Sequence, residues 1–294
     1  MERPDYPFAS HFAPLMNGRM HYVDHGTGDA VVFAHGTPTW SYEFRHLIRA
    51  LAPRWRCVAP DHLGFGLSDR PPGANYTPEA HAARFREFVD SLGLRTFALV
   101  VHDYGGPIAL PLALEARVRR IVLINTWMWP LDDDPEMRTR ARMVEGGVGR
   151  FLYRRLNLSL RVIMPGAYGD RRRLTREIHA QYLERFRDPK SRALVLWPLA
   201  RAILGSSAYY ASLWSRVDRL KAVPVQIIWG MKDTAFRPHL IPRWTAALPQ
   251  ARVLRLESAG HWPHEEAPTE VANAIAEFLS GAPTSPGARA EPRL

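Results

Sequence analysis

The sequence lacks most of the features that would place a protein outside the cell or within a membrane. Its single cysteine, Cys57, excludes an intrachain disulfide, so cysteine usage gives no sign of an oxidising compartment. Residues 1–5 lack the basic start and the apolar stretch of a signal peptide. No uncharged apolar run approaches about 18 residues, which argues against a transmembrane helix. We therefore expect a cytoplasmic protein that has no membrane partner.

Lysine is also scarce, since Lys190, Lys221 and Lys232 are the only lysines among 39 basic residues. The net charge of +10 would suit a nucleic-acid partner. However, the arginines form no stripe interleaved with aromatic residues, and the densest basic run, 170–176, indicates the solvated start of a helix. We expect no nucleic-acid partner.

The serine motif of esterases, G-x-S-x-G, is absent as well. The nearest match, residues 66–70, has Arg70 in place of the last glycine, so we expect Ser68 to have a structural role in a turn. What stands instead is the run 98–107, which predicts a buried strand that turns sharply into a helix with Asp103 at the apex. A carboxylate at that position can displace a leaving group from a saturated carbon and carry the product as an ester.

Short apolar runs alternate with helical patterns along most of the chain. Five runs predict buried parallel strands, at 31–34, 57–59, 98–101, 121–124 and 225–229. Residues 252–256 suggest a more exposed later strand, and 20–24 an early edge strand. Helices are expected at 42–51, 79–92 and 268–279, with Thr77 as the N-cap of the second. This alternation predicts an α/β fold with a mostly parallel, doubly wound sheet.

The alternation stops between residues 133 and 217, where the chain is helical, arginine-rich and aromatic. We interpret this stretch as a helical cap inserted between two parts of the core, residues 1–132 and 218–280. Such a cap would close over the carboxyl ends of the strands, where ligands bind in open α/β sheets. The proline-rich tail, 281–294, is expected to be disordered.

Three residues in chain order form a candidate catalytic set. Asp103 is the expected nucleophile, His261 the base that activates water, and Asp233 the residue that orients the imidazole. Asn125, which ends an earlier strand, cannot supply that charge. His264 is the rival base; the pair also resembles two ligands of an H-x-x-H metal site, but no third ligand is near in sequence, so we predict no metal.

An oxyanion hole is expected from two backbone amides. Thr37 follows the first buried strand, and Tyr104 follows the candidate nucleophile. Amides at these two places make the oxyanion hole of the nucleophile-elbow arrangement.

At these residues the chain resembles the haloalkane dehalogenases of the α/β-hydrolase superfamily, over about residues 18–280. The matching motifs are H-G-x-P-T-W-S-Y at 35–42, D-x-x-G-x-G-x-S-D at 61–69, H-D-x-G-G-P at 102–107, N-T-W at 125–127, W-G-M-K-D at 229–233 and G-H at 260–261. The resemblance implies an α/β-hydrolase fold and a cofactor-free hydrolase. Its partners would be a small apolar haloalkane or epoxide, water and the halide product.

The sequence departs from that family at two positions. The family's usual halide donors are a Trp after the nucleophile and often an Asn after His-Gly, whereas this chain has Tyr104 and Thr37. Both replacements carry hydroxyls that can donate a hydrogen bond. Trp197 of the cap could compensate, and we expect the pocket to include the side chains of Trp40, Trp127, Trp197 and Tyr182.

Our first hypothesis is hydrolytic carbon–halogen cleavage through an ester on Asp103. The second is epoxide hydrolysis by the same triad, with a cap tyrosine such as Tyr182 or Tyr209 as the acid. The third is a ligand-binding member of the fold that has lost its chemistry.

Overall fold

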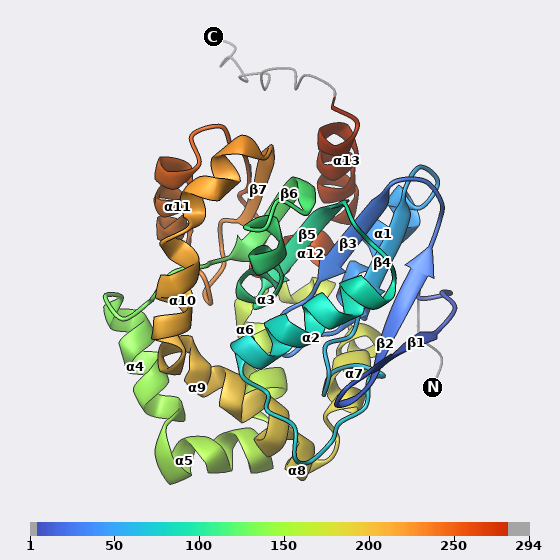
Figure 1. The fold of residues 1–294 in the computed structure, drawn as a ribbon. Coiled ribbons are helices and arrows are strands. Elements are labelled where there is room, and N and C mark those ends of the chain that lie inside the picture. The colour runs from blue at the N-terminus through green and yellow to red at the C-terminus, as the bar shows by residue number, and fades with distance from the viewer. Residues whose placement is uncertain (1–4, 282–294) are drawn as a thin grey trace.

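The computed structural model describes residues 5–281, and its centre is one eight-stranded sheet with the order β1-β2-β4-β3-β5-β6-β7-β8 (Figure 1). The six strands β3 to β8 are parallel to one another, while β2 pairs antiparallel with both β1 and β4. The strands are β1 His11–Leu15, β2 Gly18–His25, β3 Ala30–Ala34, β4 Arg56–Pro60, β5 Phe97–Asp103, β6 Val118–Thr126, β7 Val225–Gly230 and β8 Arg252–Leu256. The predicted α/β-hydrolase fold with a mostly parallel sheet is confirmed.

The apolar runs became strands because both faces of the sheet are covered. Every residue of β3, β5 and β7 is buried. Burying one Val, Leu or Ile side chain stabilises a fold by about 1.5–3 kcal/mol, so these strands anchor the core. The more exposed strand expected at 252–256 is β8, in which only Leu256 is buried.

The prediction of an edge strand at residues 20–24 was wrong, because β1 pairs along the outer side of β2. β1 gave no clear signal in the sequence. Its residues alternate only weakly, Ala13 is its one buried residue, and Pro14 lies within it. Such a strand is tolerated because the edge of a sheet needs neither burial nor every backbone donor.

Helices cover both faces of the sheet (Figure 1). α1 and α13 pack against each other, as do α2 and α3. The helices outside the region between β6 and β7 are η1 Ser41–Phe44, α1 Arg45–Leu51, α2 Pro78–Ser91, α3 Gly105–Ala113, η7 Pro238–Leu240, α11 Ile241–Ala247, α12 Pro263–Glu266 and α13 Pro268–Leu279. The three helices expected from periodicity are present, and Thr77 caps α2 by accepting a hydrogen bond from the amide of Ala80.

Between β6 and β7 the chain forms helices only, and we call this stretch the insertion (residues 127–224). Its helices are α4 Pro135–Val144, α5 Gly146–Phe151, η2 Leu152–Leu156, η3 Ser159–Ile163, α6 Met164–Ala167, η4 Arg171–Arg173, α7 Arg176–Arg185, α8 Pro189–Ser191, η5 Arg192–Leu196, α9 Trp197–Gly205, α10 Ser207–Trp214 and η6 Val217–Ala222. None of the helices in residues 5–281 is long and apolar enough to cross a bilayer. Of the expected disordered tail, all but Gly281 lies outside the described residues.

Candidate active site

Asp103 ends β5 at a sharp turn into α3. Its φ of +52° lies in the left-handed region, which costs a residue with a side chain about 1–2 kcal/mol. The hydroxyl of Thr126 on the neighbouring strand holds the turn by donating to the backbone oxygen of Asp103 at 2.6 Å. Gly105 is required just after the turn, because a Cβ there would lie 1.9 Å from the carbonyl oxygen of Ala34. The strain therefore serves to present one carboxylate.

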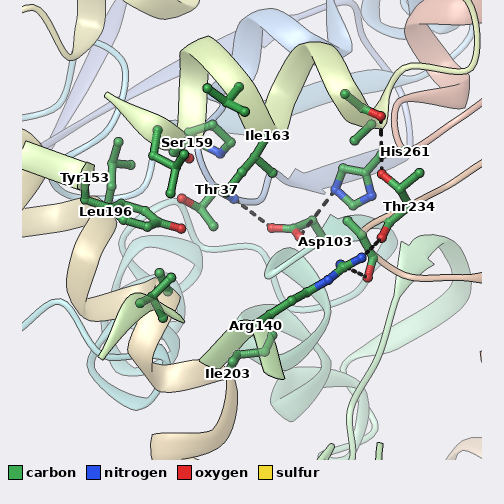
Figure 2. Close-up of a pocket in the computed structure, with 18 of the residues that line it drawn as sticks. Thr37, Asp103, Arg140, Tyr153, Ser159, Ile163, Leu196, Ile203, Thr234 and His261 are labelled. Atoms are coloured by element: carbon green, nitrogen blue, oxygen red, sulfur yellow. Dashed lines mark hydrogen bonds and ion pairs between the residues drawn. The ribbon is translucent and has the colours of Figure 1, made fainter. Parts of the chain in front are cut away.

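The two carboxylate oxygens of Asp103 have different neighbours. Oδ1 accepts a hydrogen bond from the backbone amide of Thr37 at 2.8 Å, and Oδ2 lies 3.4 Å from Nε2 of His261 (Figure 2). The loop before Thr37 can approach this closely because Gly36 has no side chain; a Cβ there would lie 2.1 Å from Oδ1. Tyr104 is the N-cap of α3, so its amide lies at the N-terminus of that helix. Only Oδ2 is left without a backbone donor.

Asp233 holds the other side of the His261 ring. Its Oδ2 lies 2.8 Å from Nδ1 of His261, and its Oδ1 accepts hydrogen bonds from the amides of Ala235 and Phe236 at 2.6 and 3.0 Å. Asn125 adds a fourth donor, since its side-chain amide lies 2.7 Å from Oδ2. Asn125 therefore supports the orienting carboxylate without supplying charge of its own. The three candidate residues are brought together as the sequence predicted, while their catalytic roles stay a prediction.

The pKa of His261 is set by opposing effects. Burial disfavours the charged ring, but the charge and hydrogen bonds of Asp233 and Asp103 outweigh it and raise the pKa to about 10. The ring of His261 is therefore protonated at neutral pH in the resting site. Any reaction that neutralises Asp103 removes one of the two groups that keep this proton in place.

The rival base, His264, does not reach the carboxylate of Asp103. It is fully buried, its ring stacks on Phe44, and its Nε2 lies 3.9 Å from Oε2 of Glu43. Together with His102, these two residues place three ligand-type atoms within 4.8 Å of one another. The sequence concealed this group because Glu43 and His102 come from distant parts of the chain. The H-x-x-H pair itself is split, since His261 faces two aspartates instead.

His102 links the nucleophile strand to the loop of the base. Its Nε2 lies 2.8 Å from the carbonyl oxygen of His261, and its Nδ1 lies 3.2 Å from Oε1 of Glu43. A carbonyl and a carboxylate are both acceptors, whereas a neutral imidazole donates through one nitrogen only. The buried pair of His102 and Glu43 fixes the backbone of His261 directly behind the ring.

A cavity of about 520 Å³ opens in front of Asp103 (Figure 2). We call the residues that come from the core its floor: Thr37, Pro38, Asp103, Tyr104, Thr234, Ala235, Phe236, His261 and Trp262. The residues that come from the insertion form its roof: Met137, Arg140, Ala141, Met143, Val144, Leu152, Tyr153, Leu158, Ser159, Val162, Ile163, Gly166, Ala167, Leu196, Ala200 and Ile203. The roof is mostly apolar, so the cavity suits an apolar small molecule.

None of the four aromatic residues expected in the pocket lines this cavity. Trp40 stacks on Tyr42, and Trp127 stacks on Phe236, which itself lies at the floor. Both tryptophans are fully buried. They were chosen because they follow motif residues, but proximity in sequence does not determine which way a ring points.

The other two expected pocket residues, Trp197 and Tyr182, make hydrogen bonds outside the cavity. The indole of Trp197 donates to the backbone oxygen of Val144 at 2.8 Å, and the hydroxyl of Tyr182 donates to Glu265. Trp197 therefore joins α9 to α4 and does not replace a halide donor. Tyr182 belongs to a buried polar cluster in which Tyr168 and Arg45 also donate to Glu265.

Tyr104 does not offer its hydroxyl as we expected from the sequence. Its ring lines the floor, but its hydroxyl donates to the backbone oxygen of Leu199 at 2.5 Å, so its one proton is already used. Thr37 differs, because its Oγ1 is buried and has no hydrogen-bond partner within residues 5–281. Of the two expected donors, only the Thr37 hydroxyl remains free.

Sequence reasoning did not single out Tyr153, which lies on η2 in the roof. Its side chain is only 6% exposed, and its hydroxyl makes no hydrogen bond within the described residues. Burial raises its pKa, so the hydroxyl stays protonated. In Figure 2, Tyr153 and Thr37 lie on one side of Asp103 and His261 on the other. Tyr209, the other expected acid, instead donates to the backbone oxygen of Pro107 at 2.7 Å.

Comparisons with known proteins agree with this geometry. The profile of the family described as "alpha/beta hydrolase fold" matches residues 29–268. "Haloalkane dehalogenase 2" of Mycobacterium tuberculosis is 40% identical over 276 residues, covering 92% of this chain and 95% of its own. "Cis-3-alkyl-4-alkyloxetan-2-one decarboxylase" of Shewanella oneidensis is 30% identical, covering 93% and 89%. A solved "putative ancestral haloalkane dehalogenase" superposes with a TM-score of 0.80 at 30% identity, covering 92% and 99%.

Proposed function

The chain belongs to the α/β-hydrolase fold family and is a haloalkane dehalogenase-like hydrolase, and from this we propose that Asp103, His261 and Asp233 carry out hydrolytic cleavage of a carbon–halogen bond. One observation carries the assignment. The strained Asp103 turns its carboxylate into an apolar cavity, with an amide on one oxygen and the imidazole of His261 beside the other. No cofactor is needed for this chemistry.

In the first step, Oδ2 of Asp103 attacks the halogen-bearing carbon. A carbon–oxygen bond forms as the carbon–halogen bond breaks, and the halide leaves with both electrons. Oδ2 is the suitable nucleophile because Oδ1 is held by the amide of Thr37 at 2.8 Å. Oδ1 then becomes the carbonyl oxygen of the ester and is already in its oxyanion hole.

In the second step, His261 activates water against the ester. Esterification removes the charge of Asp103, so the pKa of His261 falls from about 10 and the ring can lose its proton. Neutral Nε2 then takes a proton from water, and the hydroxide attacks the ester carbon. The amides of Thr37 and Tyr104 hold the resulting oxyanion. As the adduct collapses, His261 gives the proton it took from water to the departing alcohol oxygen. The carboxylic acid left on Asp103 then passes its proton to His261, which restores the resting carboxylate.

The departing halide needs donors in a site that excludes bulk water. We assign this role to the hydroxyls of Thr37 and Tyr153. Both residues line the cavity, and the Thr37 hydroxyl has no other partner in the described residues. The roof that carries Tyr153 belongs to residues 133–217, which we propose act as the cap. Its apolar lining favours small apolar haloalkanes and excludes water from the leaving group. A cytoplasmic location also belongs to this proposal.

The His261→Phe variant tests the two-step scheme. It should release about one equivalent of bromide from 1-bromobutane, because ester formation needs no base, and then stop with a butyl group on Asp103. Peptide mass spectrometry and a halide assay would measure both. His264→Gln, which changes a buried histidine outside the cavity, should still turn over. A His261→Phe protein that keeps cycling, or carries no adduct after releasing bromide, would contradict the scheme.

A second candidate function is the opening of a strained oxygen ring, such as an epoxide. It is favoured by Tyr153, because a protonated phenol can give a proton to the alkoxide that forms when Asp103 opens the ring. The same ester hydrolysis would then yield a diol. Diol formation that is lost in Tyr153→Phe, with no halide released from any bromoalkane, would favour this function over the first.

A further inference from the structure

The roof helices carry an unusual concentration of exposed apolar side chains. Six of the eight large hydrophobic residues that are exposed in residues 5–281 fall within 143–163: Met143, Val148, Phe151, Leu156, Val162 and Ile163. We call these six the apolar cap face. Single exposed hydrophobics are ordinary on a protein surface, but six of them within so short a segment indicate an interaction site.

The side chains of the apolar cap face are largely exposed to solvent and are not part of the packed core. Val148 is 72% exposed, Met143 60% and Phe151 55%. These residues come from α4, α5 and the helical turns that follow. Figure 1 shows α5 at the lower edge of the molecule, at the opposite end from α13.

The same segment is strongly basic. Residues 142–163 contain five arginines and one acidic residue, Glu145. Four of the arginines, Arg142, Arg150, Arg155 and Arg161, are exposed, and within the described chain none of the four forms an ion pair. Arginine on the rim of an apolar surface can keep its charged group in water while its stem lies along that surface.

This combination identifies the chemistry of the partner. A second protein chain would need its own acidic groups to match these arginines, whereas an anionic bilayer offers both negative headgroups and an apolar interior. We propose that the apolar cap face and its arginines dock the protein peripherally on an anionic lipid surface. The proposal concerns the outer surface of the insertion and does not depend on the proposed function. It reverses the expectation of no membrane partner, which rested on the absence of a spanning helix and says nothing about surface contact.

The face also adjoins the opening of the cavity. Met143, Val162 and Ile163 are exposed, and all three line the roof. Docking would therefore bring the cavity next to the bilayer, where apolar molecules concentrate. Because these three residues belong to the cavity, tests of docking should leave them unchanged.

Vesicle binding by the full chain tests the proposal. We expect the protein to float with vesicles of phosphatidylcholine and phosphatidylglycerol, to ignore vesicles of phosphatidylcholine alone, and to bind less as salt rises. Removal of Arg142, Arg155 and Arg161 together, each changed to Gln, should weaken binding on the order of 100-fold, at about fivefold for each arginine. The matched control, Arg95→Gln with Arg255→Gln, changes two exposed arginines of the core and should bind normally.

The apolar contribution needs a separate variant. Val148→Ser, Phe151→Ser and Leu156→Ser together should weaken binding at least about 10-fold, because their apolar area no longer enters the headgroup region. Phe12→Ser with Met16→Ser, the two exposed hydrophobics of the core, is the matched control. Circular dichroism and thermal unfolding would confirm that each variant is folded.

Two outcomes would overturn the proposal. One is binding that is absent, or equal for neutral and anionic vesicles. The other is self-association in solution that the apolar variant abolishes without vesicle binding, which would make the face an interface between copies of this chain. Asp103→Ala should bind vesicles as the unmodified protein does. Failure of the docking proposal would appear in vesicle binding, and failure of the proposed function would appear in turnover, so the two can be told apart.

Discussion

The floor and the roof of the cavity are built in different ways. On the floor, Asp103 is held by the amide of Thr37, and His261 is held by Asp233, which is itself fixed by two amides and Asn125. On the roof, Tyr153 offers a hydroxyl with no partner in the described chain, surrounded by apolar side chains. Under the proposed function, the floor is preorganised for one reaction sequence, whereas the roof determines what enters and which leaving group is accepted. Changes to the floor should therefore abolish chemistry, and changes to the roof should alter selectivity.

The largest effect is expected from Asp103→Asn. An amide is a poor nucleophile, so turnover of haloalkanes should fall about 10⁵-fold or more, as for other enzymes that lose the nucleophile. Halide release measured with freshly purified protein would show this, with mass spectrometry to exclude deamidation back to aspartate. Full turnover by a variant whose side-chain amide is still intact would mean that the floor does not work through a covalent ester.

Asp233→Asn should be the next most severe change. It keeps the shape of the side chain but removes the carboxylate charge that faces Nδ1 of His261. The corresponding change in a serine-type triad lowers kcat about 10⁴-fold. The pKa of His261 should also fall, since Asp233 is a main cause of its elevation. Single-turnover measurements should show ester formation nearly unchanged and ester hydrolysis slowed. A loss confined to halide release would place Asp233 in a different role.

The contrast between floor and roof also explains what the sequence could and could not predict. The strands and the positions of Asp103, Asp233 and His261 follow from local patterns, because each residue sits just beyond a recognisable strand. Nothing local showed that Tyr153, rather than Tyr182 or Tyr209, would face the cavity. The direction of a side chain on a roof helix depends on how that helix rotates against its neighbours. The four expected pocket aromatics failed for the same reason.

Long-range pairings were equally hidden. Glu43 and His102 are 59 residues apart, and their contact behind His261 depends on the packing of η1 against the sheet. The strand β1 was missed because an edge strand with one buried residue leaves little pattern to detect. Sequence therefore predicted most of the sheet and the floor better than it predicted the buried Glu43–His102 contact or the roof.

Tyr153→Phe should test the roof with a smaller effect. Loss of one donor to a developing negative charge costs about 10²–10³ in rate, and we expect the lower end because the hydroxyl of Thr37 remains. The loss should fall on halide release and be larger for chloride, the poorer leaving group, than for iodide. Tyr209→Phe, whose hydroxyl binds Pro107 outside the cavity, is the control. A Tyr153→Phe variant that loses nothing, or loses the same factor for chloride, bromide and iodide, would show that the roof makes no contact with the leaving group.

The smallest expected effect is on stability, and it comes from the floor. The pKa of His261 is about 10 in the folded protein and near its ordinary value of 6.5 in the unfolded chain, so the folded state binds this proton more tightly. That stabilisation is fully present below pH 6.5 and is lost as the pH rises toward 10. Thermal unfolding should therefore show the difference in Tm between the unmodified protein and His261→Gln shrinking by several degrees across this range. In Asp103→Asn the loss should begin near the same pH but be complete at a lower pH, because one of the two carboxylates that raise the folded-state pKa of His261 is gone. A Tm difference that is flat from pH 6.5 to 10 would mean that the resting floor does not contain a charged His261.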